Sequence, residues 1–164
     1  MKVSSFTQLK AALVSPDTEI ILIRDIPILE PITIPREKYI SFQSYMFLSR
    51  GQKILFYGGL DPVRKQRFQG FGPGDIAGTF NSDKIFPEWW GLIPNQNEIA
   101  INCAISSLLG SVSGHTISLA SGTYYVSGPI DLRASLSYLA GASSGSTFIV
   151  ATKDWSAKFE NSTY

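Results

Sequence analysis

The sequence is poor in cysteine and in charge. Its single cysteine, Cys103, cannot form a disulfide within the chain, and the usual behaviour of a free cysteine predicts a small, buried apolar residue. Only 16% of the residues are charged and the formal net charge is +1, whereas soluble domains typically carry about 25% charged residues. So small a net charge provides no long-range attraction for polyanions, and nucleic acid is therefore not expected as a partner.

Long apolar runs are also missing. The longest run near the start, Ile20 to Ile23, has the length of a strand, whereas a membrane-spanning helix needs about 20 apolar residues. No membrane insertion is therefore predicted. The segment Met1 to Ser5 carries one positive charge but is not followed by the apolar stretch of about 7 to 15 residues that a secretory signal requires. We therefore expect assembly in the cytoplasm, as for a virion component, or the removal of a leader.

Ser, Thr, Asn, Gln and Gly take the place of charge, as is usual in β-rich extracellular or virion proteins. Short β-branched or aromatic runs separated by Asp, Pro, Gly and Ser predict strands. Several of them begin or end at proline, which favours short strands that meet at corners over a flat open sheet. The predicted strands are Glu19–Arg24, Pro31–Ile34, Tyr39–Phe42, Tyr45–Leu48, Lys53–Tyr57, Ile76–Phe80, Thr116–Leu119, Thr123–Val126, Ile130–Leu132, Leu136–Leu139 and Thr147–Val150.

Two short helices interrupt these runs. Ser5 and Gln8 have the spacing of a capping box, which predicts a helix that runs to about Leu13. A second helix is expected from about Asn97 to Leu109, closed by Gly110. Its apolar stripe consists of Ile101, Ala104, Ile105 and Leu108.

The strands after Gly114 follow one another at short, fairly even spacing. Three short strands per coil, with about 20 residues from Ile117 to Ser137, is the period expected of a solenoid whose coils stack their inward side chains. A β-sandwich with evenly spaced strands has the same periodicity, so it stays open as an alternative at this point.

A longer series of residues follows a recognisable order. Its members are Asp75–Phe80, Ile85–Gly91, Ala100, Ile101, Ala104, Ile105, Leu119, Gly122–Tyr124 and Gly141. This order resembles the N-terminal part of the pectate-lyase-like right-handed parallel β-helix family, which is found in phage tailspikes and bacterial surface proteins. The resemblance spans roughly Val3 to Ile149, and the double tryptophan is its distinctive part.

The resemblance implies a mainly β fold, in which a small N-terminal β-rich subdomain (1–74) precedes a capping element and the first coils of a right-handed parallel β-helix (75–164). The open end of such a stack must be covered. The residues expected to cap it are Trp89, Trp90, Pro87, Gly91, Ile101 and Ile105. Adjacent tryptophans also suit a sugar-binding platform. Related chains usually have an acidic loop before the helix, whereas 92–97 is short and neutral here.

A small basic group lies between Asp61 and Gln69. Arg64, Lys65 and Arg67 fall within four residues, which is common in solvated surface connections. A solvated connection is therefore the first interpretation. The alternative is that these side chains contact an anionic sugar or a partner protein.

Catalytic chemistry is not evident in the sequence. Glycan cleavage needs two carboxylates poised across a glycosidic bond, or a base with a neutralising cation or metal. The acidic residues after the double tryptophan are few, namely Glu98, Asp131, Asp154 and Glu160. His115 precedes a predicted strand and is interpreted as a turn or edge residue. No catalytic, metal or cofactor residue is therefore assigned.

These observations lead to a functional hypothesis. The chain is expected to be the N-terminal, structural or attachment portion of a homotrimeric phage tailspike or tail-fibre protein in the virion tail. Other tail or baseplate proteins and a bacterial surface polysaccharide are the expected partners. In the family, an active groove usually lies on later coils. The alternatives are part of a secreted or cell-surface polysaccharide lyase or glycoside hydrolase, and a purely structural virion protein.

Overall fold

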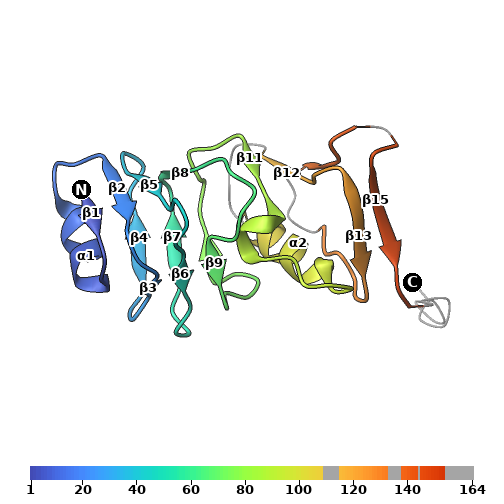
Figure 1. Cartoon of the computed structure of the whole chain (residues 1–164), viewed down its shortest axis with the longest axis horizontal. Coiled ribbons are helices and arrows are strands. Elements are labelled where there is room, and N and C mark those ends of the chain that lie inside the picture. The colour runs from blue at the N-terminus through green and yellow to red at the C-terminus, as the bar shows by residue number, and fades with distance from the viewer. Residues whose placement is uncertain (109–114, 133–137, 144, 154–164) are drawn as a thin grey trace, which may run out of the picture.

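The computed structural model describes residues 1–108, 115–132, 138–143 and 145–153. It is mainly β, with 30% strand and 16% helix. The molecule is elongated, and the N-terminal helix lies at one of its ends (Figure 1). All strand pairs among the described residues are parallel. The sandwich of antiparallel sheets, left open by the sequence, is therefore excluded for this part of the chain.

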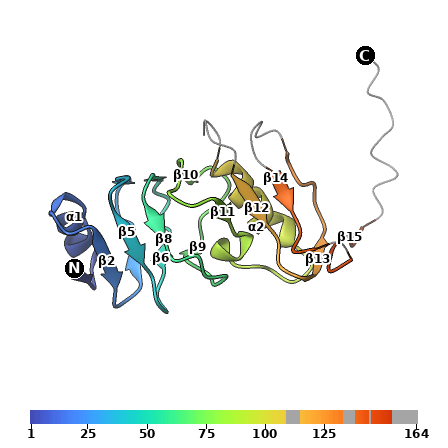
Figure 2. The same cartoon turned by 90° about the horizontal axis from the view of Figure 1, so that it is seen from above.

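The first 77 residues pass through three parallel sheets in turn. Each pass adds one strand to every sheet, so strands that are distant in sequence lie side by side, as β2, β5 and β8 do in Figure 2. The first sheet contains β1 (Lys2–Val3), β2 (Glu19–Leu22), β5 (Tyr39–Ser41) and β8 (Gly59–Leu60); the second contains β3 (Ile26–Pro27), β6 (Phe47–Leu48) and β9 (Phe68–Gln69); the third contains β4 (Ile32–Ile34), β7 (Ile54–Phe56) and β10 (Ile76–Ala77).

The register of these sheets places apolar side chains above one another. In the first sheet, Ile20 lies opposite Ile40, and Ile40 lies opposite Leu60. The other two sheets repeat the arrangement with Ile26, Phe47 and Phe68, and with Ile32, Ile54 and Ile76. All of these side chains are buried. A shift of one residue would turn each buried set toward solvent, so burial specifies the register.

The helix α1 (Phe6–Val14) covers the end of the stacked sheets at which the chain begins. Ser5 is its N-cap, and the Ser5 hydroxyl accepts a hydrogen bond from the Gln8 amide at 3.3 Å. The reciprocal bond differs by one residue from a capping box, because Gln8 Oε1 accepts from the Ser4 amide at 2.7 Å. Beyond the helix, the buried Lys38 ammonium donates to the carbonyls of Ser15 and Asp17, at 2.6 Å each.

The second half of the molecule contains a helix between two groups of strands. In Figure 1, α2 (Asn97–Ser106) lies between β9 and β13. The expected helix was too long, because α2 ends at Ser106 and Ser107 is its C-cap; Gly110 lies outside the described residues. The remaining elements are β11 (Lys84–Ile85), the 3-10 helix η1 (Pro87–Trp90), β12 (Thr116–Ser118), β13 (Gly122–Val126), β14 (Tyr138–Ala140) and β15 (Thr147–Ala151).

The sheets in this half are also parallel, with β12 between β11 and β14, and β13 beside β15. The strand predicted at Ile130–Leu132 is wrong, because this segment pairs with no strand. Its backbone is held by the side chain of Asn102 instead, which accepts from the Asp131 amide at 2.9 Å and donates to the Pro129 carbonyl at 2.9 Å. The two-residue strands β1, β3, β8, β9 and β11 were not predicted, because a run of two residues shows no alternation of apolar and polar side chains.

One buried apolar cluster runs from Val3 to Tyr124 and joins both halves. The pairing of β10 with β7 crosses residue 74, so the subdomain boundary expected there does not coincide with a break in the core. Cys103 lies in this cluster and is 1% exposed, which confirms the expectation of a small buried residue. Burial raises the pKa of its thiol to about 12, so the reactive thiolate is scarce at neutral pH.

Candidate functional site

The double tryptophan forms a packed junction between α2 and the N-terminal sheets. Trp89 is fully buried, and its indole Nε1 donates to the carbonyl of Val63 at 3.0 Å. The Trp89 carbonyl accepts from the Arg67 amide at 2.8 Å, next to β9. Trp90 packs its ring 5.1 Å from the Phe68 ring, measured between centroids. The indoles thus belong to a network of aromatic contacts that includes Phe42, Phe80 and Phe86.

The other predicted capping residues belong to the same region. Pro87 is buried in the first turn of η1, and Ile101 and Ile105 are buried on α2. Gly91 ends η1 with a φ of 83°, and a Cβ at this position would lie 2.7 Å from the Gln66 side chain. The junction lies inside the molecule, between two groups of strands, instead of at a free end. Because neither indole exceeds 7% exposure, the pair offers no open face to a sugar.

An ion-pair network connects this junction with the later strands. Arg64 Nη1 lies 3.0 Å from Glu88 Oε1, and it also donates to the carbonyl of Ser118 in β12 at 2.8 Å. The Arg64 guanidinium stacks over the Phe86 ring at 4.2 Å. The hydroxyl of Tyr124 in β13 donates to Glu88 Oε1 at 3.0 Å. Arg64 and Glu88 therefore tie the segment before β9 to η1, β12 and β13.

Removing the Tyr124 hydroxyl tests whether this network stabilises the fold. It also accepts from the Ala120 amide at 2.8 Å, so Tyr124→Phe leaves one donor and one carboxylate oxygen without this partner. We expect the substitution to lower the free energy of unfolding by about 1 to 3 kcal/mol. Tyr125→Phe is the matched control, because Tyr125 is 45% exposed. Urea denaturation of both variants measures the difference, and equal midpoints would contradict a stabilising role for the Tyr124 hydroxyl.

The same side chain predicts a pH dependence. Burial and the nearby Glu88 carboxylate raise the pKa of Tyr124 to about 12, whereas an unfolded tyrosine has a pKa of about 10. Between these values the unfolded chain loses a proton that the folded protein keeps, so stability falls as the pH rises from about 10 to about 12. The fall should be smaller in Tyr124→Phe. Denaturation midpoints measured from pH 8 to about 12 test this, and parallel curves for both proteins would contradict it.

Polar side chains on α2 accept backbone hydrogen bonds that a neighbouring strand would otherwise accept. Asn97 Oδ1 accepts from the Tyr125 amide at 2.8 Å, and Glu98 Oε2 accepts from the Ser127 amide at 3.1 Å. Asn102 continues the series one turn later with the Pro129 and Asp131 bonds described above. A helix inserted beside a strand would otherwise leave backbone donors unpaired. Glu98 is therefore engaged in holding the backbone.

The predicted basic group is not a uniform surface. Lys65 is exposed, Arg64 lies in the network above, and Arg67 is only 2% exposed. Arg67 Nη1 donates to the carbonyl of Gln43 at 2.9 Å, and Nη2 lies 3.7 Å from Asp61 Oδ2. Burial lowers the pKa of Arg67, and Asp61 opposes this effect. The solvated connection was thus wrong for Arg67, and Lys65 is the one exposed member of the group.

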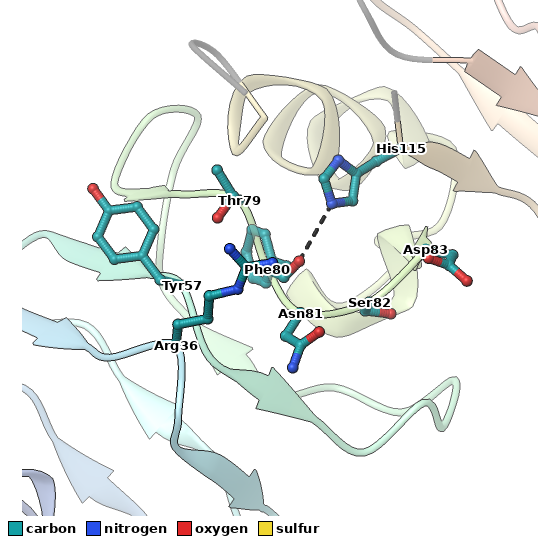
Figure 3. Close-up of a pocket in the computed structure, with 8 residues that line it drawn as sticks. All are labelled: Arg36, Tyr57, Thr79, Phe80, Asn81, Ser82, Asp83 and His115. Carbon is teal, nitrogen blue, oxygen red and sulfur yellow. Dashed lines mark hydrogen bonds between the residues drawn. The ribbon is translucent and has the colours of Figure 1, made fainter. Parts of the chain in front are cut away.

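A separate cavity of about 280 Å³ lies at the corner between the third and first sheets. Figure 3 shows Arg36 and His115 on either side of the Phe80 backbone, with Tyr57 beside Arg36. His115 is buried, and its Nε2 lies 3.3 Å from the Phe80 carbonyl oxygen. It directly precedes β12, which starts at Thr116 as the sequence predicted. The lining residues are Arg36, Tyr57, Thr79, Phe80, Asn81, Ser82, Asp83 and His115.

The comparisons found no matching family model, curated protein or solved structure. The functional argument therefore depends on the geometry. Within the described residues, no three His, Cys, Asp or Glu side chains are grouped so that they could hold a metal ion. No helix in the same part of the chain is long and apolar enough to cross a membrane.

Sequence reasoning missed the cavity, although a signal for it was present. Arg36, Tyr57 and Thr79 follow β4, β7 and β10, which are successive strands of one sheet. Ile32 pairs with Ile54 and Ile54 with Ile76, so the interval is 22 residues at this edge. Applying that interval after each strand would have aligned Tyr57 with Thr79. Arg36 lies one residue beyond this column, because the same interval aligns it with Gly58.

Proposed function

We propose that this chain is the structural or attachment portion of a phage tailspike or tail-fibre-like protein, folded as a right-handed parallel β-helix. The observation that carries the proposal is the repeated passage through three parallel sheets, in which neighbouring strands lie about 20 residues apart, as Ile20 and Ile40 do. Such a repeat is characteristic of solenoids. The resemblance of residues 75–91 to tailspike proteins and the low charge of the chain support the same proposal.

Assembly with further protein is part of the proposal. Among the described residues, β14 and β15 each pair with one other strand. They expose Tyr138, Phe148, Ile149 and Val150, with exposed fractions between 41% and 71%. Apolar side chains gathered on an open edge favour contact with more protein. We propose a homotrimer in the virion tail, attached to other tail or baseplate proteins and involved in recognising a bacterial surface polysaccharide.

The charged groups of the junction favour an attachment or structural role over catalysis within this segment. Glu88, Glu98 and Asp61 each accept hydrogen bonds from protein groups. Carboxylates committed in this way are poorly placed to act as a general acid and base on a glycan. A purely structural virion protein is the second candidate, since the same committed contacts support it.

Incubation with bacterial capsule and lipopolysaccharide tests the proposal. We expect the protein to bind at least one polysaccharide in a broad panel without releasing new reducing ends or unsaturated uronates. Light scattering after size-exclusion chromatography should give the mass of a trimer. A stable monomer would remove the trimer, binding to none of the panel would favour the purely structural role, and glycan cleavage would favour the secreted or surface enzyme.

A further inference from the structure

We propose that the corner cavity binds one carboxylate-bearing sugar unit, such as a hexuronate of an acidic polysaccharide, with Arg36 pairing with the sugar carboxylate. This inference rests on the proposed role in polysaccharide recognition and assigns it a site. The cavity is separate from the double-tryptophan junction, whose side chains are engaged with one another.

The backbone of the cavity is held by the stacked strands. The Tyr57 amide donates to the Ile34 carbonyl at 2.9 Å, and the Phe80 amide donates to the Phe56 carbonyl at 3.2 Å. The Asn81 amide donates to the Gly58 carbonyl at 2.8 Å. Side chains that follow these bonds start from fixed positions, which lowers the entropic cost of binding a ligand.

An unusual backbone conformation shapes the middle of the wall. Phe80 has a φ of 28°, in the region that favours glycine. Its ring is 3% exposed and stacks on the Phe56 ring with centroids 5.1 Å apart. Packing therefore holds a conformation that costs energy by itself, and such outliers gather at functional sites. The turn directs the chain from Phe80 through Asn81 and Ser82 to Asp83 along the cavity.

The cavity has an arginine in its wall that makes no ion pair with a described residue. The ion pairs among the described residues involve the N-terminus, Lys10, Arg64 and Arg67, so the exposed Arg36 has no anionic partner in this part of the chain. Asn81 and Asp83 are likewise exposed. This contrasts with Arg64, whose guanidinium is already bonded to Glu88 and Ser118.

The composition of the wall indicates the ligand. A guanidinium binds a carboxylate through two parallel hydrogen bonds. Asn81 and Thr79 offer donors and acceptors for hydroxyl groups, whereas Asp83 offers acceptors. The Ser82 hydroxyl donates to the Lys84 carbonyl and can still accept. Figure 3 places Arg36 and Asp83 on different sides of Phe80, so a sugar carboxylate is attracted to one side and repelled from the other. At about 280 Å³, the cavity is smaller than the roughly 300 to 1,000 Å³ typical for drug-sized ligands, which suits a single ring.

Titration of the full chain with glucuronate and galacturonate, followed by amide chemical shifts in NMR, tests the inference. Glucose and galactose are the neutral controls. We expect both uronates to shift the amides of residues 36, 57 and 80–83, while the indole Nε1–H signals of Trp89 and Trp90 stay unchanged. Arg36→Gln should weaken uronate binding about ten- to hundredfold. Arg50→Gln, which removes an exposed arginine elsewhere, should leave it unchanged.

The outcomes separate the site from the proposed function. Uronate binding that Arg36→Gln does not weaken, or equal shifts with the neutral sugars, would overturn the site, as would no shift with either uronate. Loss of affinity in Arg36→Gln counts only with a wild-type pattern of amide shifts elsewhere, and an unfolded Arg36→Gln would refute the premise that this exposed side chain is free of structural contacts. If uronates bind at the cavity but no bacterial polysaccharide binds the protein, the site stands and the proposed function fails.

Discussion

Replacing Trp89 with alanine should lower the free energy of unfolding by about 3 to 5 kcal/mol, the range found for large aromatic truncations in cores. The Trp89 side chain is fully buried. Its ring contacts those of Phe80, Phe86 and Trp90 at centroid distances of 6.2, 5.3 and 6.4 Å. The substitution would leave a cavity between α2 and the N-terminal sheets and would remove the donor to the Val63 carbonyl. Urea denaturation at equilibrium measures the effect.

Phenylalanine substitutions at the two indoles provide a matched comparison. Both remove the indole nitrogen and keep an aromatic ring. Trp89 Nε1 has a partner in Val63, whereas Trp90 Nε1 is buried without one among the described residues. Trp89→Phe should therefore be more destabilising than Trp90→Phe, by about 1 kcal/mol, the typical net value of one hydrogen bond. The reverse order would show that ring volume, and not the hydrogen bond, distinguishes the two positions.

The Trp89→Ala variant also separates packing from recognition. If the indoles serve only the junction, folded Trp89→Ala protein should bind glycans as the wild type does. Unchanged stability together with lost glycan binding would instead make the tryptophan pair a sugar platform, in spite of its burial.

Replacing Asp61 with asparagine should lower the free energy of unfolding by about 3 kcal/mol, which is the second large effect expected. Removing one member of a buried ion pair leaves an uncompensated charge, which typically costs about 3 to 5 kcal/mol. The Arg67 side chain is 2% exposed and that of Asp61 is 17% exposed, so the pair is largely shielded from water. Asp61 also accepts from the Phe42 amide at 2.7 Å and lies next to the Gln43 turn, whose φ is 51°. Asparagine keeps one oxygen acceptor, so the lower end of the range is expected.

A double-mutant cycle isolates the pair. Arg67→Met removes the buried cation, keeps an unbranched chain of similar length, and loses the donor to the Gln43 carbonyl. If the cost of Asp61→Asn comes from the unpaired guanidinium, the double variant should be more stable than the sum of the two single effects predicts, by about 0.5 to 3 kcal/mol. Additive effects would show that the ion pair at 3.7 Å contributes nothing specific.

Short-range patterns in the sequence predicted much of the secondary structure correctly. The Ser5 cap, the start of α2 at Asn97 and the main strands follow from local spacing. The mainly β character follows from β-branched runs and low charge. The end of α2 was misplaced because the hydroxyls of Ser106 and Ser107 bond to the helix's own carbonyls, a competition that an apolar stripe does not reveal.

The sequence by itself determined where the two helices begin and where the main strands lie, because these depend on residues that are neighbours in the chain. The burial of the double tryptophan depends on distant partners such as Val63 and Phe68. Only the tertiary structure decided which charged side chains form hydrogen bonds within the protein and which are exposed. No local pattern distinguishes Arg36 from Arg64 and Arg67. In the structure, Arg64 donates to the Ser118 carbonyl and Arg67 donates to the Gln43 carbonyl, both distant in sequence. Arg36 is exposed and lines the cavity. Stacking of strands about 20 residues apart creates these contacts, and no local pattern encodes where each long side chain ends.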